Sequence, residues 1–260
     1  MKSKKLFILL AILFLSSISL LAETDEANFY YNYGNACANE EDYDKAIEYF
    51  QATIEVDPNH ALAYYNMGLA YNYKENYDKA IECYQKAIEI DQNDANAYNN
   101  MGIAYKNKEN YDKAIESYQN AIEIDPGYAL AYCNMGNAYN DKENYDKAIE
   151  CFQRAIEIDS GYALAYLNMG ITYNYKENYD KAIVYYERAI EIDPDYALAY
   201  YNIGITYYLI FWDISAADNL YQAGLLYLEQ NNRQLALKTL DVMKDFVPDS
   251  PLIQKLMDKL

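Results

Sequence analysis

The chain of 260 residues contains a single histidine, His60. Its sequence has no Ser-His-Asp set, no Cys-His pair, no metal-ligand spacing and no glycine-rich phosphate loop. These absences exclude the common arrangements for hydrolysis, metal-dependent catalysis and phosphoryl transfer. We therefore interpret His60 as a loop residue, and we predict that the chain is not an enzyme and binds no cofactor and no metal.

Basic residues are also scarce, since 21 Lys and Arg stand against 40 Asp and Glu, a net charge of −19. The first 22 residues carry three lysines and no acid, so their removal would leave 18 − 40 = −22. Phosphate backbones would be repelled by such a chain. Nucleic acid is therefore excluded as a partner, although 33 tyrosines could in principle stack on bases. We expect protein partners that are basic if charged, and tyrosines that serve mainly as packing.

The N-terminus differs from the rest of the chain. Three lysines precede the apolar run Leu6–Leu15, and small residues lead to a candidate cleavage point after Ala22. This pattern predicts a signal peptide over residues 1–22. Leu20 is larger than the residue usual two places before a cut, so an uncleaved membrane anchor stays an alternative. The predicted location is the periplasm or cell envelope of a bacterium, or otherwise the secretory pathway, with membrane contact only through this segment.

After the N-terminus the sequence repeats with a fixed period. The stretch "KENYDKAIE" begins at Lys74, Lys108 and Lys142, and a fourth copy at Lys176 differs only at Val184. Each copy comes 34 residues after the last. Glycine and alanine follow the same period, at Gly34, Gly68, Gly102, Gly136, Gly170 and Gly204, and at Ala46, Ala80, Ala114, Ala148, Ala182 and Ala216. A fixed period of this length indicates a solenoid.

Each repeat is predicted to be a pair of amphipathic helices. Apolar and small residues occupy one helical face twice per repeat: Tyr98, Met101, Gly102 and Tyr105, then Tyr111, Ala114, Ile115, Tyr118, Ala121 and Ile122. Asn110 is placed to cap the second helix, which should end before Pro126. We expect Gly102 and Ala114 to allow the two helices to approach closely. Stacked pairs would cover each other's apolar faces.

These positions resemble the tetratricopeptide repeat (TPR). The matching residues are Tyr98, Met101, Gly102, Tyr105, Ala114, Tyr118, Ala121 and Pro126. The resemblance implies an all-α, right-handed α-solenoid of antiparallel helix pairs, whose concave face binds peptide segments of other proteins. We assign five regular repeats to residues 27–196, divergent shortened repeats to 197–250 and a C-terminal capping helix to 251–260.

The chain departs from the family pattern at several places. Glu occupies the turn position where the family often has Gly, at Glu41, Glu75, Glu109, Glu143 and Glu177. A left-handed residue there would fall on a neighbouring Asn or cost about 1 kcal/mol. Gln92 and Ser160 replace the proline that ends the second helix. The segment Ser215–Gln230 fits either the second helix of the sixth repeat or the first helix of a seventh, and both assignments can hold together.

The cysteines are predicted to be free. Their number is even, which in an exported protein suggests disulfides: Cys37, Cys83, Cys133 and Cys151. Cys83 and Cys151 occupy the same place two repeats apart, whereas Cys37 and Cys133 point in other directions, so bridging geometry is improbable. We interpret all four as substitutes for tyrosine, which fills the same places in other repeats.

A second stripe on each first helix lies opposite the core and is the candidate ligand groove. In one repeat it consists of Asn96, Asn99, Asn100, Ile103, Lys106 and Asn107. Stacking aligns one row of Asn32, Asn66, Asn100, Asn134, Asn168 and Asn202, and beside it Tyr31, Tyr65, Asn99, Cys133, Leu167 and Tyr201. Amides could hold a peptide backbone and tyrosines supply rigid contact area. The alternative is that this abundance of Asn and Tyr is compositional. Lys106 is nearly the only base on this stripe, so a carboxylate clamp like that of some family members is not predicted.

The stretch "YYLIFWDI", Tyr207–Ile214, interrupts the repeat pattern and contains the only tryptophan. Phe211 and Trp212 are either a docking patch or filler for a shortened repeat. The prediction from sequence is an exported, non-enzymatic interaction scaffold that binds a peptide or helix of a partner in its groove. The alternatives are a structural or self-assembling envelope component, including a homo-oligomer, and an accessory subunit of a larger complex.

Overall fold

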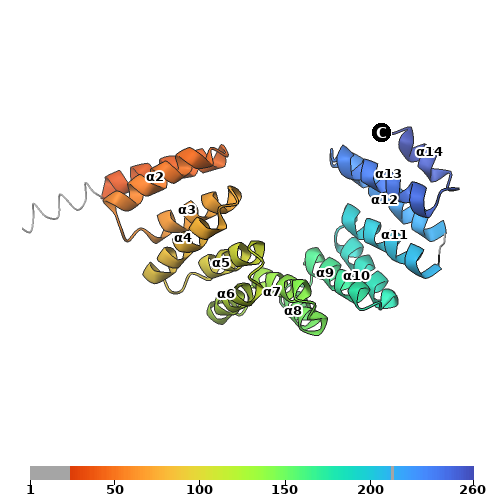
Figure 1. The fold of residues 1–260 in the computed structure, drawn as a ribbon, viewed down its shortest axis with the longest axis horizontal. Coiled ribbons are helices and arrows are strands. Elements are labelled where there is room, and N and C mark those ends of the chain that lie inside the picture. Colours follow the sequence, from red (N-terminus) through yellow and green to blue (C-terminus); the bar gives the residue numbers. More distant parts are fainter. Residues whose placement is uncertain (1–23, 212–213) are drawn as a thin grey trace, which may run out of the picture. The chain divides into compact units, whose positions relative to one another are not determined.

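The structure is a computed structural model that describes residues 24–211 and 214–260. Throughout this part of the chain the regular elements are helices (Figure 1), as predicted. The predicted signal peptide, residues 1–22, and Trp212 of the predicted docking patch lie outside the described residues.

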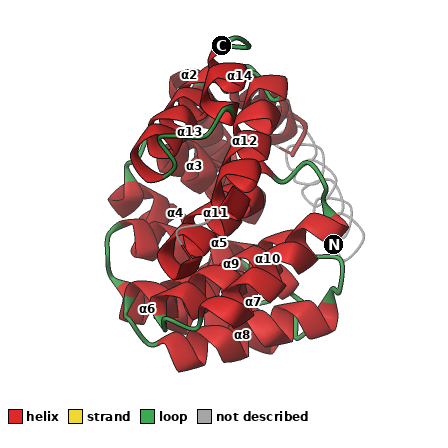
Figure 2. Ribbon diagram, turned by 90° about the vertical axis from the view of Figure 1, so that its right-hand side faces the viewer, coloured by secondary structure: helices red, strands yellow, loops and turns green. Residues whose placement is uncertain are grey.

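The chain divides into two compact units, residues 1–126 and 127–260, which are described here one at a time. In unit 1 a helix over residues 24–39 precedes α2 (Tyr43–Val56), α3 (Ala61–Tyr73), α4 (Tyr77–Ile90), α5 (Ala95–Asn107) and α6 (Tyr111–Ile124). Unit 2 contains α7 (Ala129–Asp141), α8 (Tyr145–Ile158), α9 (Ala163–Tyr175), α10 (Tyr179–Ile192), α11 (Ala197–Phe211), α12 (Ile214–Glu229), α13 (Arg233–Phe246) and α14 (Leu252–Met257). Short loops connect successive helices within each unit (Figure 2).

Successive helices pack against each other, so each repeat is the predicted helix pair. In unit 1, α3 packs on α4 and α5 on α6, and α4 also packs on α5 of the next repeat. Buried tyrosines fill these contacts, since Tyr84 and Tyr118 in unit 1 and Tyr186 in unit 2 are fully buried. At these positions the prediction that tyrosine serves as packing is confirmed.

The glycine of each repeat marks the closest approach of its two helices, as predicted. A Cβ added at Gly102 would lie 2.6 Å from Cε1 of Tyr118, and one at Gly170 would lie 3.1 Å from the Ala182 carbonyl oxygen. Ala114 is completely buried at the same contact. No side chain larger than hydrogen fits at these glycines without moving the aromatic ring or the backbone that it would meet.

The "KEN" turn ends one helix and begins the next. Glu75 has a φ of 58°. Its N–H donates to the carbonyl of Asn72 at 2.9 Å, and the N–H of Asn76 donates to that of Tyr71 at 2.9 Å. These two bonds form a Schellman motif. The Asn76 side chain then accepts from the N–H of Lys79 at 3.3 Å and caps α4.

The other turns repeat this geometry, and the predicted N-cap Asn110 is confirmed by its bond from the N–H of Lys113 at 3.4 Å. The left-handed residue is the glutamate itself and not a neighbouring asparagine, at Glu41, Glu75, Glu109, Glu143 and Glu177. Of the two outcomes anticipated from sequence, the strained one is therefore correct, at a cost of about 1 kcal/mol per turn. The turn is stabilised because the N–H groups of the glutamate and of the asparagine after it both donate hydrogen bonds, and the asparagine side chain caps the next helix.

The remaining letters of "KENYDKAIE" link neighbouring repeats. Lys74 forms an ion pair with Asp44 of the preceding repeat, and Lys176 forms the equivalent pair with Asp146 at 2.5 Å. Within one repeat, the lysine of the second helix, Lys79, lies over the Tyr71 ring of the first helix at 5.1 Å. These contacts are largely exposed, so each contributes about 0–1 kcal/mol.

The helix α12 belongs to two repeats at once, as the sequence allowed. A Cβ added at Gly204 of α11 would lie 2.7 Å from Cγ of Leu220, so α12 completes the sixth repeat. At its other end Asn231 has a φ of 57° and Asn232 caps α13, which is the turn found inside every regular repeat. The short helix α14 packs against α12 and α13, with Leu256 fully buried as a terminal cap would require.

Candidate functional site

The predicted asparagine row joins the first helices of successive repeats. In unit 1, Nδ2 of Asn66 donates to the Tyr31 hydroxyl at 3.1 Å and to Oδ1 of Asn35 at 2.7 Å. Nδ2 of Asn100 donates to the Tyr65 hydroxyl at 2.8 Å. The row therefore has a structural role that the sequence analysis did not assign. The Nδ2 donors of Asn66 and Asn100 face the preceding repeat.

Four predicted groove residues are covered. Cys133 is 0 %, Asn99 and Leu167 are 1 % and Asn168 is 9 % exposed, and Nδ2 of Asn168 donates to Sγ of Cys133 at 3.4 Å. The prediction that Asn99, Cys133, Leu167 and Asn168 line the groove is therefore wrong. The other predicted groove residues are half-buried or exposed: Tyr31, Asn32, Tyr65, Asn66, Asn100, Lys106, Asn134, Tyr201 and Asn202.

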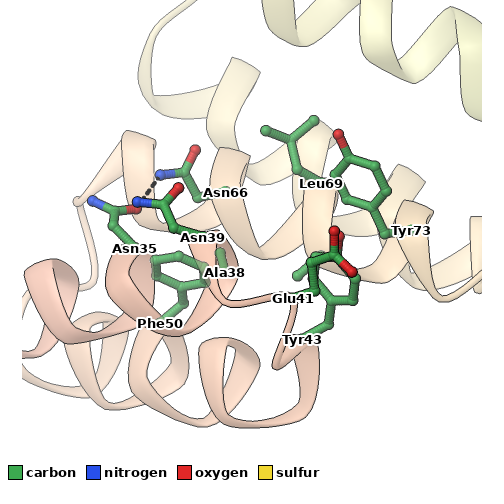
Figure 3. A pocket seen from close by; sticks show the side chains of 10 residues that line it. Asn35, Ala38, Asn39, Glu41, Tyr43, Phe50, Asn66, Leu69 and Tyr73 are labelled. Atoms are coloured by element: carbon green, nitrogen blue, oxygen red, sulfur yellow. Dashed lines mark hydrogen bonds between the residues drawn. The ribbon is translucent and has the colours of Figure 1, made fainter. Parts of the chain in front are cut away.

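Unit 1 contains a hollow of about 560 Å³ on this side of its first helices. We call it the N-terminal hollow. It is lined by Asn35, Ala38, Asn39, Glu41, Tyr43, Phe50, Asn66, Leu69, Ala70 and Tyr73. Figure 3 shows the three asparagines at one end and Glu41, Tyr43 and Tyr73 at the other. Its volume lies in the range typical of ligand sites, about 300–1,000 Å³.

Stacked tyrosines border the hollow. The rings of Tyr43 and Tyr73 lie 5.0 Å apart and nearly parallel, at 11°. Tyr73 is 66 % exposed, so its outer face is open to a ligand. Unit 2 has an equivalent pair, Tyr145 and Tyr175, at 5.5 Å and 20°. The sequence analysis did not single out these rings, because nothing in one repeat reveals which tyrosine meets a tyrosine of the next.

The Glu41 carboxylate gives this end of the hollow its charge. Glu41 is exposed, and no ion pair holds its carboxylate in the described part of the chain. Loss of hydration raises the pKa of Tyr43, and the negative charge of Glu41 raises it further. Glu41 lies at the same end of the hollow as the rings of Tyr43 and Tyr73 (Figure 3). The hollow therefore combines an aromatic face with a single negative charge.

The cysteines are free, as predicted. Burial raises the pKa of the Cys83 and Cys151 thiols to about 12, and that of Cys133 to about 11. At neutral pH these thiols are protonated and therefore poor nucleophiles. They do not supply a reactive centre.

His60 has a defined structural role, which corrects its interpretation as a plain loop residue. Its Nδ1 accepts from the N–H of Ala63 at 3.2 Å and caps α3. Among the described residues, no three His, Cys, Asp or Glu side chains gather as a metal site requires. None of the described helices has the length and apolar character needed to cross a bilayer. Phe211 is the last residue of α11.

Comparison with protein-family models identifies tetratricopeptide repeats along most of the chain. Models of the tetratricopeptide repeat match residues 27–60, 49–82, 68–109, 93–160, 127–195, 185–210 and 218–250. The match over 218–250 agrees with α12 acting as the first helix of a final repeat. No curated protein sequence matches the chain significantly.

Solved structures that resemble the chain are TPR proteins. YrrB, described as a TPR protein with an unusual peptide-binding site, is 30% identical with a TM-score of 0.56, over 72% of this chain and 95% of YrrB. MamA is 30% identical with a TM-score of 0.58, over 64% of this chain and 96% of MamA. PilF of Pseudomonas aeruginosa has a similar fold at 17% identity, with a TM-score of 0.62 over 92% of this chain and 100% of PilF. The chain therefore belongs to the tetratricopeptide-repeat family, whose stacked helix pairs serve as scaffolds for binding other proteins.

Proposed function

We propose that the chain is an exported, non-enzymatic scaffold that binds a peptide or helical segment of a partner protein along the groove side of its first helices. The observation that carries the proposal is that two faces of the helices differ in exposure. The glycine and alanine faces are buried in helix packing, as at Gly102 and Ala114. The opposite stripe keeps half-exposed amides and tyrosines and, in unit 1, a hollow.

The asparagines remain suited to a peptide even though they join repeats. Asn66 and Asn100 use Nδ2 for their bonds to the preceding repeat. That leaves Oδ1 of each to accept an N–H from an extended backbone. The internal bonds also fix the orientation of the amides, which lowers the entropy lost on binding. The peptide-binding site of the similar protein YrrB supports the same use.

Export is the second part of the proposal. It is supported by the basic and apolar segment at residues 1–22 and the small residues that precede Ala22. The partner would accordingly be a protein of the periplasm or cell envelope if the source is bacterial, and of the secretory pathway otherwise.

The proposal is tested by selecting short random-sequence peptides on the full chain and measuring their affinity for variants. Asn66→Asp with Asn100→Asp removes the Nδ2 donors whose internal bonds orient both amides, and Gln119→Glu makes the matched amide-to-acid change on an exposed site of the second helix α6. We expect selected peptides to lose affinity for the double variant and to keep it for Gln119→Glu. Recovery of no binding peptide, or equal loss in both variants at unchanged melting temperature, would contradict the proposal.

A self-assembling role is the second candidate, favoured by one observation. Phe29 and Tyr33 on the helix over residues 24–39 are 53 % and 47 % exposed, and the centroids of their rings lie 4.6 Å apart. In a longer solenoid a preceding repeat would pack on this face. A second copy could cover this face. Light scattering across a concentration series decides it, because a monomer at every concentration excludes assembly and leaves the peptide-binding proposal unaffected.

A further inference from the structure

Two of the residues that line the N-terminal hollow are small. Ala38 and Ala70 stand on successive first helices of unit 1. The residues at the same places three repeats later are Asn140 and Thr172, since 38 + 102 = 140 and 70 + 102 = 172. Those two side chains bond to each other, with Asn140 Nδ2 2.8 Å from the Thr172 hydroxyl. The chain thus contains a filled and an unfilled version of one position.

The other lining residues are almost unchanged between the two versions. Tyr43, Tyr73 and Glu41 correspond to Tyr145, Tyr175 and Glu143, and Phe50 and Asn66 correspond to Phe152 and Asn168. The alanine pair is therefore the main difference that opens a space beside the stacked rings of unit 1. It also gives a matched internal control for any ligand of the hollow.

The charge of the hollow selects a cation. Among the ten described residues that line it, Glu41 alone is charged. The nearest lysines are already paired, Lys45 with Asp42 at 2.6 Å and Lys74 with Asp44. The whole chain carries a net charge of −19, which favours the approach of a basic segment.

We infer that the N-terminal hollow binds an arginine side chain of the partner segment, with the guanidinium stacked against Tyr73 and hydrogen-bonded to Glu41. The inference rests on the proposed function and names the residue that the partner presents at one end of the groove. It concerns unit 1 only.

Arginine fits this chemistry better than lysine. Its guanidinium is planar, so it can lie flat on a tyrosine ring, and its five N–H groups form a fork that matches a carboxylate. The half-buried amides of Asn35 and Asn66 at the far end of the hollow can meet the peptide backbone that carries the arginine (Figure 3). Lysine would present a single, strongly hydrated charge to the same surface.

The test uses the peptides selected on the full chain. We expect arginine to be enriched at one position of these peptides, and its replacement by citrulline, which removes the charge and keeps the shape, to weaken binding at least about fivefold. Replacement by lysine should weaken it by a smaller factor. Tyr73→Ala and Glu41→Gln should each weaken binding of the arginine peptide and abolish its preference over the citrulline peptide. Both positions are exposed, and the melting temperature of each variant shows whether the fold is kept.

The internal control is the filled position of unit 2. Ala38→Asn with Ala70→Thr copies Asn140 and Thr172 into the hollow and should weaken arginine-peptide binding by about tenfold or more, because it fills the space beside the rings. Tyr175→Ala, the matched change in unit 2, should leave the affinity unchanged.

The outcomes separate the inference from the proposed function. Peptides that bind without arginine enrichment, or a Tyr175→Ala effect equal to that of Tyr73→Ala, overturn the arginine site and leave peptide binding intact. Failure to select any binding peptide overturns both. Arginine enrichment that is lost in the hollow-filling double variant and retained in Tyr175→Ala supports the inference.

Discussion

The two units use one repeat sequence but satisfy its polar positions differently. In unit 1 the helices α3 and α5 are capped by the side chains of His60 and Asp94, whereas the N-cap residues of α7 and α9 in unit 2, Tyr128 and Tyr162, form no side-chain cap bond. Unit 2 adds bonds between successive first helices through buried threonines. The two units thus differ in the polar contacts at the starts of these helices and between them.

The threonine seam is the clearest difference. Thr172 bonds with Asn140, and Thr206 bonds with Asn174 at 2.8 Å. The corresponding residues of unit 1 are Ala70 and Ala104. Oδ1 of Asn72 and the hydroxyl of Tyr84 are buried there without a hydrogen-bond partner among the described residues. Unit 1 therefore lacks the threonine hydrogen bonds of unit 2, and it contains the N-terminal hollow beside its first helices.

The largest expected effect tests what the units share. Ala114→Leu in unit 1 and Ala182→Leu in unit 2 overpack the closest helix approach, so each should lower the free energy of unfolding by about 1–3 kcal/mol. Urea unfolding of the two variants measures the loss. An unchanged midpoint in either variant would show that the helices of that unit do not meet where the glycine and alanine place them.

The next effect tests the threonine seam. Thr206→Val keeps the shape and removes the hydroxyl that bonds Asn174, so it should lower the free energy of unfolding by about 1–2 kcal/mol. Ala104→Thr makes the reverse change next to Asn72 in unit 1 and should raise it by about 0.5–1 kcal/mol. Calorimetry measures both. A stabilised Thr206→Val variant would mean that the seam is not a source of stability.

The side-chain cap of the first helix α5 in unit 1 should give a slightly smaller effect. The Asp94 carboxylate accepts from the N–H of Ala97 at 3.0 Å. Asp94→Ala removes this hydrogen bond and should lower the free energy of unfolding by about 1 kcal/mol. Hydrogen exchange should report faster exchange at the start of α5 and no change in α9, which has no side-chain cap. Equal acceleration in both helices would contradict the local role of the cap.

The smallest expected effect concerns the left-handed turns. Glu109→Gly removes the strain of a φ of 58° but adds conformational freedom to the unfolded chain, so the free energy of unfolding should rise by about 0.5 kcal/mol. Asn231→Gly at the last turn should raise the free energy of unfolding by less, because asparagine tolerates this conformation better than glutamate. Thermal unfolding compares the two. A destabilised Glu109→Gly variant would show that the glutamate side chain stabilises the turn in another way.

The fold could be predicted from the sequence because the fixed period of 34 residues assigns each residue a place in the repeat. Gly102, Ala114 and Asn110 lie where the repeat pattern places them. The double membership of α12 also followed from the spacing of Gly204 and Gly224.

The site could be predicted only in part, because its features depend on contacts between repeats. The burial of Asn99 and the bond of Asn66 to Asn35 come from the neighbouring first helix, which one helical stripe cannot show. The N-terminal hollow depends on a pair of alanines in successive repeats, and either alanine alone looks like ordinary packing. The left-handed glutamates replaced the glycine that usually signals such a turn.

The central claim is that the groove side of the first helices recognises a partner, while the glycine and alanine faces are used for packing between helices. Hydrogen exchange of the full chain with and without a selected peptide tests it directly. We predict slower exchange in α3 and α5 on binding, with α4 and α6 unchanged. Slower exchange in α4 and α6, with α3 and α5 unaffected, would contradict the claim.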